Sequence, residues 1–264
     1  MVTLDELTRA HAWLNQLRPL PDPVLKELNH RYEVDLSHHS TAIEGNTLTK
    51  SETQIVIEKG ITISGKPLVD HLEVVGHKEA LNYVMGLAGS EAMVSEWDVR
   101  SIHSLVMKGQ AQEHSGAWRR LDVKAAGTDY SYPTYLQIPD LMAEFIAWLS
   151  QPSHLHPILF ASEAHLRFVT IHPFQDGNGR DGRLLLNLLL MKAGYPIAVI
   201  QLQERPQYIA ALESAQSGNG RDDLDNLILR SLKDSFVETF RTALSYQDLV
   251  IDSGLKSEIL GWID

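Results

Sequence analysis

The sequence contains no cysteine, and this absence excludes several kinds of chemistry. Without cysteine there is no disulfide bond, no thiolate nucleophile and no zinc site built on cysteine ligands. No stretch approaches the roughly eighteen consecutive apolar residues of a membrane-spanning helix, so no membrane partner is expected. The N-terminal residues lack a basic region followed by a continuous apolar segment. We therefore expect no signal peptide and predict a cytoplasmic location.

An excess of basic residues is missing as well. The chain has 23 Lys and Arg against 34 Asp and Glu, which gives a net charge of −11. A nucleic-acid-binding protein usually carries a basic surface, so we expect no nucleic acid as the main partner. With 44% hydrophobic and 22% charged residues, the composition is that of an ordinary globular protein. At 264 residues the chain is long enough to bury a sizeable core.

Most of the sequence has the spacing of amphipathic helices. Thr49 and Glu52 form a capping-box pattern, and Gly60 is a natural residue for the end of that helix. The same spacing predicts further helices over 68–85, 95–109, 137–150, 156–171, 180–193, from Pro206 onward, and over 223–245.

One segment departs from the helical pattern. Residues 116–136 are rich in Tyr, Thr and Val and are broken by Gly127 and Pro133, which favours a hairpin or an irregular flap. The sequence therefore predicts an all-α protein, a helical bundle with a short β-hairpin flap.

Residues 172–183 read HPFQDGNGRDGR and lead into the apolar run 184–191. The turn residues 176–179 precede a helix, so their amides and the helix dipole would form an anion site. Arg180 and Arg183 share a face of the first helical turn and could bind phosphate oxygens. Asp176 is an oxygen ligand suited to Mg²⁺, and His172 can accept a proton near neutral pH.

Taken singly, each of these features has an ordinary structural explanation. The glycines could form only a turn, Asp176 could cap the helix, the two arginines could be solvated, and His-Pro-Phe could be a packed corner. However, nine specified positions in twelve match the signature of the Fic family, HPFx(D/E)GNGRxxR. At about 5% for each residue type, chance gives this match on the order of 10⁻¹² per starting position.

The sequence thus resembles the Fic family over roughly residues 35–245. The segment from Gly116 to Arg119, Gly-Ala-Trp-Arg, is similar to the family's Gly-x-aromatic-Arg pattern that opens the flap. The resemblance implies a mostly α-helical Fic fold with the flap over the active site. It also implies a protein adenylyltransferase, which transfers AMP from ATP to a Ser, Thr or Tyr hydroxyl of a target protein and releases pyrophosphate.

The resemblance also assigns roles to the motif. His172 would be the general base, and Asp176 would hold Mg²⁺ across the α- and β-phosphates of ATP. Arg180 would bind the phosphate chain and Arg183 would reach the γ-phosphate. The remaining assignments are the amides of the loop and Asn178 for the α- and β-phosphates (Gly177, Asn178, Gly179), a buried anchor (Phe174), the flap that holds the target segment (about 121–127), and the adenine pocket (Tyr208, Leu212, Gln216).

A second motif lies upstream, where residues 40–46 read STAIEGN. It resembles the inhibitory helix of some Fic proteins, (S/T)xxxE(G/N), with Ser40, Glu44 and Gly45 in the specified places. The alternative is an ordinary helix end, with Gly45 as the cap and Glu44 solvated. Because a full Fic motif follows, we favour the inhibitory interpretation and predict an ion pair between Glu44 and Arg183 that suppresses activity.

These features predict a division of the chain into three parts. Residues 1–36 would be an N-terminal helical extension, and 246–264 a short C-terminal tail. Residues 37–245 would be the Fic domain, with the inhibitory helix at about 37–45. A homodimer is a further expectation, with the segment 47–85 as the contact. Leu68 and Val69 would be its apolar anchor, or both would pack inside the protein.

Other functions stay open at this point. Glu44 could instead help a water molecule remove AMP from a modified target, which would make the protein a de-AMPylating hydrolase. The nucleotide donor could differ, as in the variant that uses a diphospho-choline donor. The kinase relative of the Doc type has a different loop, so the motif 177–179 argues against that activity. A non-catalytic nucleotide-binding regulator is disfavoured by the intact motif, and a DNA-binding regulator by the acidic charge.

Overall fold

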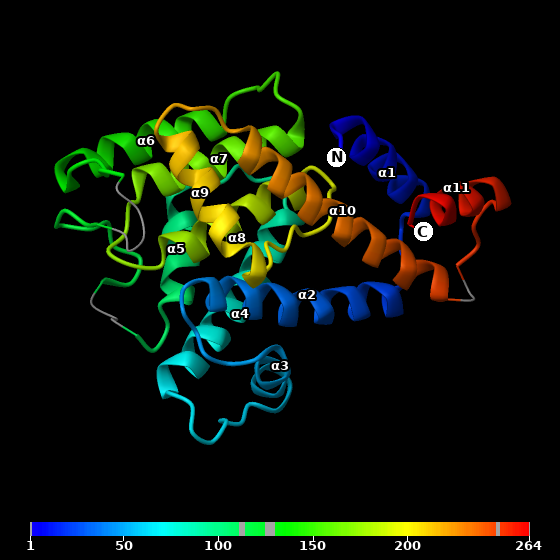
Figure 1. The fold of residues 1–264 in the computed structure, drawn as a ribbon, viewed down its shortest axis with the longest axis horizontal. Coiled ribbons are helices and arrows are strands. Elements are labelled where there is room, and N and C mark those ends of the chain that lie inside the picture. Colours follow the sequence, from blue (N-terminus) through cyan, green and yellow to red (C-terminus); the bar gives the residue numbers. More distant parts are fainter. Residues whose placement is uncertain (1, 111–113, 125–129, 247–248, 264) are drawn as a thin grey trace.

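The computed structural model describes residues 2–110, 114–124, 130–246 and 249–263. Two adjacent helices form its centre, α7 (Pro157–Ile171) and α8 (Asn178–Lys192), which pack closely against each other (Figure 1). Leucines cover most sides of α8 and almost all of them are buried, as expected for a helix enclosed by other helices. The HPFQDGNGRDGR motif thus spans the end of α7, the connecting loop and the first turns of α8.

Further helices enclose this central pair. Those that pack against α8 are α2 (Asp22–Ile43), α4 (Leu68–Ala88) and α5 (Glu96–Val106). Those that pack against α7 are α6 (Ile138–Leu149), α9 (Arg205–Gln216) and α10 (Asp222–Ser245). In Figure 1, α2 runs along one side of the bundle, so its end is carried toward the start of α8.

The two ends of the chain lie together at one end of the molecule (Figure 1). There α1 (Leu4–Leu17) and α11 (Ser253–Ile263) pack against α10 and against each other. The Trp13 indole N–H donates a 3.0 Å hydrogen bond to Glu258, which joins these two terminal helices. At another edge, α3 (Lys50–Lys59) packs on α2 and α4 through a small separate apolar cluster.

The helices expected from the sequence are present, with bounds that differ by a few residues. The Thr49–Glu52 capping box forms in both directions, and Gly60 ends α3 in the left-handed conformation with φ 63°. Helix α8 begins earlier than expected, at Asn178, because Gly177 adopts φ 80° and caps it. The all-α architecture is confirmed.

The predicted β-hairpin is not seen. The described residues 116–124 and 130–136 contain no strand, and a short 3₁₀ helix, η2 (Tyr135–Gln137), begins at the end of this segment. A second 3₁₀ helix, η3 (Leu202–Glu204), precedes α9. Residues 125–129 of the expected flap lie outside the described residues. In the described residues 130–136, Pro133 and short polar residues interrupt the alternation of apolar and polar residues that a strand needs.

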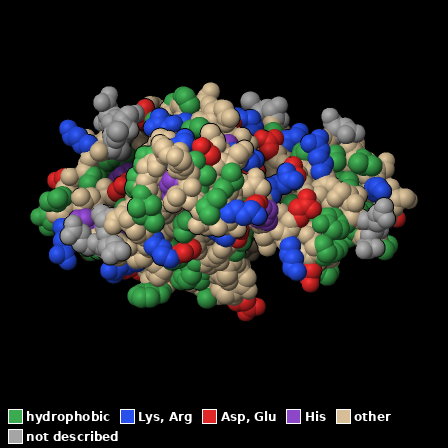
Figure 2. All heavy atoms as spheres, turned by 90° about the horizontal axis from the view of Figure 1, so that it is seen from below, with side chains coloured by type: hydrophobic (Ala, Val, Ile, Leu, Met, Phe, Trp, Pro, Cys, Tyr) green, Lys and Arg blue, Asp and Glu red, His purple; other side chains and the backbone are tan. Residues whose placement is uncertain are grey.

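The surface carries charges of both signs. Lys and Arg are interspersed with Asp and Glu on the face seen in Figure 2. Leu68 and Val69 are 64% and 45% exposed at the start of α4, so they do not pack inside the protein. In the described part of the chain, no helix is both long and apolar enough to cross a membrane.

Candidate active site

His172 ends α7 in an unusual backbone conformation. Its φ is 54°, a positive value that no other non-glycine residue shows in the described part of the chain. The His172 amide donates a 3.0 Å hydrogen bond to Phe168 O, and its Nδ1 lies 3.3 Å from Val169 O. A carbonyl can only accept, so this contact assigns the proton to Nδ1 and leaves Nε2 as a proton acceptor.

The electrostatics of His172 favour its neutral form. Burial lowers its pKa to about 4, and the nearby Arg119 cation acts in the same direction. The Val169 carbonyl, Glu44 and Asp176 oppose the shift without cancelling it. At neutral pH the imidazole is therefore uncharged and able to take a proton.

The loop after His172 is held by a stack of aromatic rings. Phe174 is fully buried and lies parallel to the His103 ring at 3.6 Å, with Trp118 4.9 Å away. Its predicted role as a buried anchor is therefore supported. His103 also accepts a hydrogen bond from Gly116 N at Nδ1, which leaves its Nε2 to donate to Asp176 O at 3.1 Å.

The Asn178 side chain closes the loop. Its amide oxygen accepts from Phe174 N and its amide nitrogen donates to Phe174 O, both at 2.9 Å. Both polar atoms of the Asn178 side chain are used by these bonds. The predicted contact between Asn178 and a phosphate would therefore be made by its backbone amide at the start of α8. Gly177 and Gly179 flank it and line the same cavity.

Asp176 is positioned as a single exposed carboxylate. Its side chain is 71% exposed, with Oδ1 accepting from Gly177 N. Among the described residues no cluster of three or more His, Asp or Glu could hold a metal. One carboxylate on the edge of the cavity beside the start of α8 still fits Mg²⁺, which commonly takes one or two carboxylates together with substrate phosphates.

The two motif arginines point to different places. Arg183 is buried and faces the cavity, whereas the Arg180 guanidinium does not line it. Arg180 lies 3.5 Å from Glu73 on α4 and 3.7 Å from both Asp176 and the Met107 sulfur. Its predicted contact with the phosphate chain therefore stays a prediction.

Glu44 reaches this site from the end of α2. Its Oε1 lies 2.7 Å from Arg183 Nη2, and the same guanidinium binds Ser40 Oγ at 3.0 Å and Ser40 O at 2.7 Å. Burial alone would lower the pKa of Arg183, but Glu44 raises it above its ordinary value. Gly45 follows with φ 108°, which ends the helix. The predicted Glu44–Arg183 pair is present.

The carboxylate of Glu44 also lies against the first turn of α8. A Cβ atom at Gly179 would collide with Glu44 Oε1 and come within 3.1 Å of Arg183 Nη1. The first turn of a helix carries unpaired amides and the positive end of the dipole, which favour an anion. Glu44 thus lies where the motif predicts phosphate binding.

A cavity of about 330 Å³ joins these elements. His172, Asp176, Arg183 and Glu44 line it, and Tyr208, Leu212 and Gln216 of α9 form another wall. The three predicted adenine-pocket residues thus meet the catalytic motif in one cavity. Tyr208 is fixed there by a 2.9 Å hydrogen bond to His165.

Sequence reasoning missed several lining residues. Arg205, Ile209 and Glu213 recur at four-residue spacing on α9, beside the predicted set, so helical periodicity could have found them. Tyr132 could not be found in this way. Its ring lies 4.1 Å from the His172 ring, but the two residues are far apart in the sequence and meet only in the folded chain.

Comparison with known proteins identifies the family of this chain. The profile of the Fic/DOC family matches residues 93–190. The protein adenylyltransferase Fic of Nematostella vectensis is 39% identical over 188 residues, which cover 70% of this chain and 43% of that protein. The chain belongs to the Fic/DOC family.

Other relatives and solved structures extend the comparison. The protein adenylyltransferase Fic of Culex quinquefasciatus is 36% identical over 76% of this chain and 40% of its own length. Fic-1 from C. elegans superimposes with a TM-score of 0.79 at 27% identity, covering 90% of this chain and 72% of that one. The chain spans about two fifths of the length of the curated relatives it matches.

Proposed function

We propose that the protein is an adenylyltransferase that transfers AMP from ATP to a hydroxyl of a target protein. The observation that carries the proposal is His172 Nε2, for which no described residue is a hydrogen-bond partner, on a cavity that also receives the N-terminus of α8. A general base and an anion site are thus directed at one space of nucleotide size. The names of the relatives support the same reaction.

In the proposed reaction, the target hydroxyl oxygen forms a bond with the α-phosphorus of ATP. The bond between that phosphorus and the oxygen leading to the β-phosphate breaks, and pyrophosphate leaves. The hydroxyl proton passes to His172 Nε2. Asp176 would hold Mg²⁺, which when bound neutralises negative charge on the phosphates. The amides of Gly177 to Gly179 and the Arg183 guanidinium would hold the phosphate oxygens.

We further propose that Glu44 inhibits this reaction within the same chain. Arg183 cannot pair fully with Glu44 and with the γ-phosphate at once, and both anions compete for the first turn of α8. ATP would then bind weakly or with its α-phosphate turned from attack. Removal of the carboxylate is expected to raise the rate on the order of 100-fold, equivalent to ~2.7 kcal/mol.

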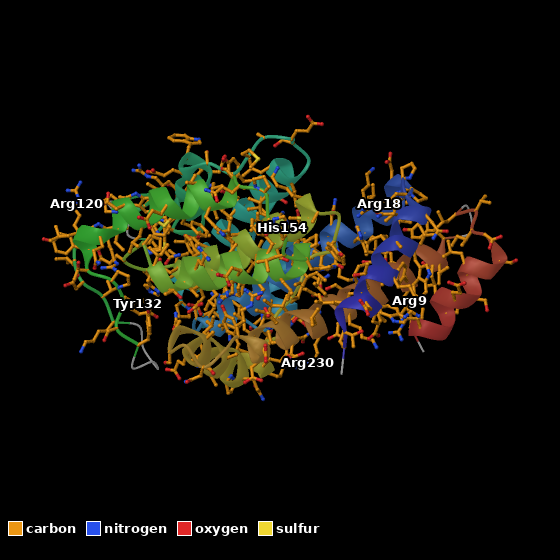
Figure 3. All side chains as sticks on the ribbon, turned by 90° about the horizontal axis from the view of Figure 1, so that it is seen from above. Arg9, Arg18, Arg120, Tyr132, His154 and Arg230 are labelled. Atoms are coloured by element: carbon orange, nitrogen blue, oxygen red, sulfur yellow. The ribbon has the colours of Figure 1, made fainter. Side chains whose placement is uncertain are left out.

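The test measures self-labelling with α-³²P-labelled ATP. Glu44→Gly should label itself much faster than the wild type, and Glu44→Gly/His172→Ala should not label. His154→Ala in the Glu44→Gly background is a matched control, because His154 is exposed and lies outside the cavity (Figure 3). Labelling that survives loss of His172 would refute the base, and equal labelling with and without Glu44 would refute the inhibition.

A second candidate activity is the reverse use of the same site, the removal of AMP from a modified target. One observation favours it: Glu44 lines the cavity with His172, and its side chain is still 38% exposed and open to water. Water would add to the phosphorus and give a proton to the Glu44 carboxylate. The bond from phosphorus to the target oxygen would break, and that oxygen would take a proton from the surrounding water. AMP release from a modified protein by the wild type, but not by Glu44→Ala, would support this hydrolase.

A further inference from the structure

Arg119 is a buried arginine with an unusual set of partners. Its side chain is fully covered, and it lies at the start of the segment 116–136 predicted to form the flap. The guanidinium donates from Nε to His172 O at 2.8 Å, from Nη1 to Leu121 O at 3.0 Å, and from Nη2 to Pro133 O. Its backbone amide binds Pro173 O at 2.9 Å. One side chain thus joins the catalytic loop to both sides of the flap segment.

These partners are uncharged carbonyls, so burial of the positive charge of Arg119 is unfavourable. Burial lowers the pKa of Arg119, which reports an unfavourable environment for its charge. Among the described residues, the carboxylate nearest to Arg119 is that of Asp122 at 3.7 Å. The Asp122 side chain is 65% exposed, so this ion pair is weak and screened by water. The planar fork of arginine suits carbonyls in fixed directions, so one guanidinium holds these three carbonyls in place relative to one another.

The geometry around His172 needs such a support. A non-glycine residue with positive φ is strained by ~1–3 kcal/mol and persists only where its surroundings fix it. The Arg119 Nε bond fixes the His172 carbonyl. The Nη2 bond holds Pro133, the residue next to Tyr132, and the Tyr132 ring lies 4.1 Å from the imidazole. Arg119 therefore acts on His172 through both its backbone and its ring neighbour.

We propose that Arg119 is a positioning residue that orients His172 for proton transfer and fixes the flap segment to it. The inference rests on the proposed transferase activity and deepens it. Arg119 does not line the nucleotide cavity. Its loss should therefore lower the rate of transfer at saturating ATP and leave the ATP concentration for half-maximal rate unchanged.

The test uses self-labelling of the full chain in the Glu44→Gly background, with the rate measured across ATP concentrations. Arg119→Lys keeps the charge but cannot reach three carbonyls, and Arg119→Gln removes the charge as well. Both should reduce the maximal rate at least tenfold, with half-saturation by ATP within twofold of the parent. Arg120→Lys and Arg120→Gln are matched controls, since Arg120 is exposed at the same end of the molecule (Figure 3), and both should stay within twofold.

The possible results separate the two proposals. Maximal rates within twofold of the parent in both Arg119 variants would overturn the positioning role while the transferase stands. A loss carried mainly by weaker ATP half-saturation would also overturn it. A variant that does not fold leaves the decision to the other, and failure of both to fold would show a general structural support instead. If the Glu44→Gly parent does not label at all, the proposed function fails and this inference falls with it.

Discussion

The Glu44–Arg183 pair predicts that a single substitution makes the protein less stable and more active. Glu44→Gln is the sharpest form of this change, because it keeps the size of the side chain and the backbone of the helix end. The amide can still accept a hydrogen bond from Arg183, but the negative charge that faces the guanidinium and the first turn of α8 is lost.

The magnitude follows from the exposure of the two partners. Removing one partner of a fully buried pair costs ~3–5 kcal/mol, whereas an exposed pair contributes ~0–1 kcal/mol. Arg183 is buried, its side chain only 2% exposed, but the Glu44 side chain is 38% exposed, and Arg183 keeps both bonds to Ser40. We therefore expect a loss of about 1–2 kcal/mol in the free energy of unfolding. For a chain of this size the loss lowers the melting temperature by ~2–8 °C.

The assay is thermal unfolding of wild type and Glu44→Gln, each with and without ATP and Mg²⁺, in the His172→Ala background so that no turnover occurs. Without nucleotide the variant should melt lower. With nucleotide it should gain more than the wild type, because ATP no longer competes with a carboxylate for Arg183. Glu144→Gln is a matched control, because Glu144 is exposed on α6 and lies outside the cavity. Equal melting temperatures together with equal stabilisation by ATP would refute competition for Arg183.

Two further predictions concern the loop and the pH dependence of stability. Phe174→Ala should lower the free energy of unfolding by ~3–5 kcal/mol and abolish transfer, because Phe174 is fully buried against His103. Urea unfolding measures this loss, and a loss below ~1 kcal/mol would contradict the role of Phe174 as an anchor of the loop. Burial lowers the pKa of His77 to about 3 and that of His165 to about 4, so below the ordinary value of 6.5 the unfolded chain binds more protons. Stability should therefore fall as pH drops from 6.5 toward 4, by up to ~1.4 kcal/mol per pH unit for each such histidine, and a flat urea-unfolding profile over that range would refute it.

The sequence could predict what depends on local pattern. The helices could be predicted from capping residues and apolar spacing, because such signals act within one or two helical turns. The Thr49–Glu52 capping box is an example. His172, Asp176 and Arg183 of the motif line one cavity, because they lie within a dozen residues across one loop. The Glu44–Arg183 contact was predicted only through the family resemblance, since nothing local brings the end of α2 to the start of α8.

Contacts between distant segments could not be predicted in this way. The spacing of Arg180 and Arg183 gives them a shared face of α8, yet their partners come from α4 and α2, so the guanidinium groups diverge. His103 offered no pattern of its own. Its importance arises because α5 places the ring flat on Phe174 and between Gly116 N and Asp176 O. The hairpin prediction relied on β-favouring residues. In the structure, the Arg119 side chain instead binds the carbonyls of Leu121 and Pro133 on the two described sides of this segment.

The arrangement at the first turn of α8 also predicts which substitutions would separate the proposed inhibition from the proposed catalysis. Gly179 leaves room for the Glu44 carboxylate, since a Cβ atom there would collide with it. The same space faces the cavity in which phosphates would lie, so a side chain at Gly179 would obstruct both anions and would not distinguish them. Arg183 is likewise needed by both. Of these three residues, Glu44 alone would serve the inhibited state and not the binding of ATP. Glu44 approaches from α2, so its replacement would leave the loop and the start of α8 intact. If Glu44 inhibits as proposed, a change that releases the inhibition and leaves the site intact would act on the end of α2. It would act on Glu44 itself or on the bonds between Ser40 and Arg183.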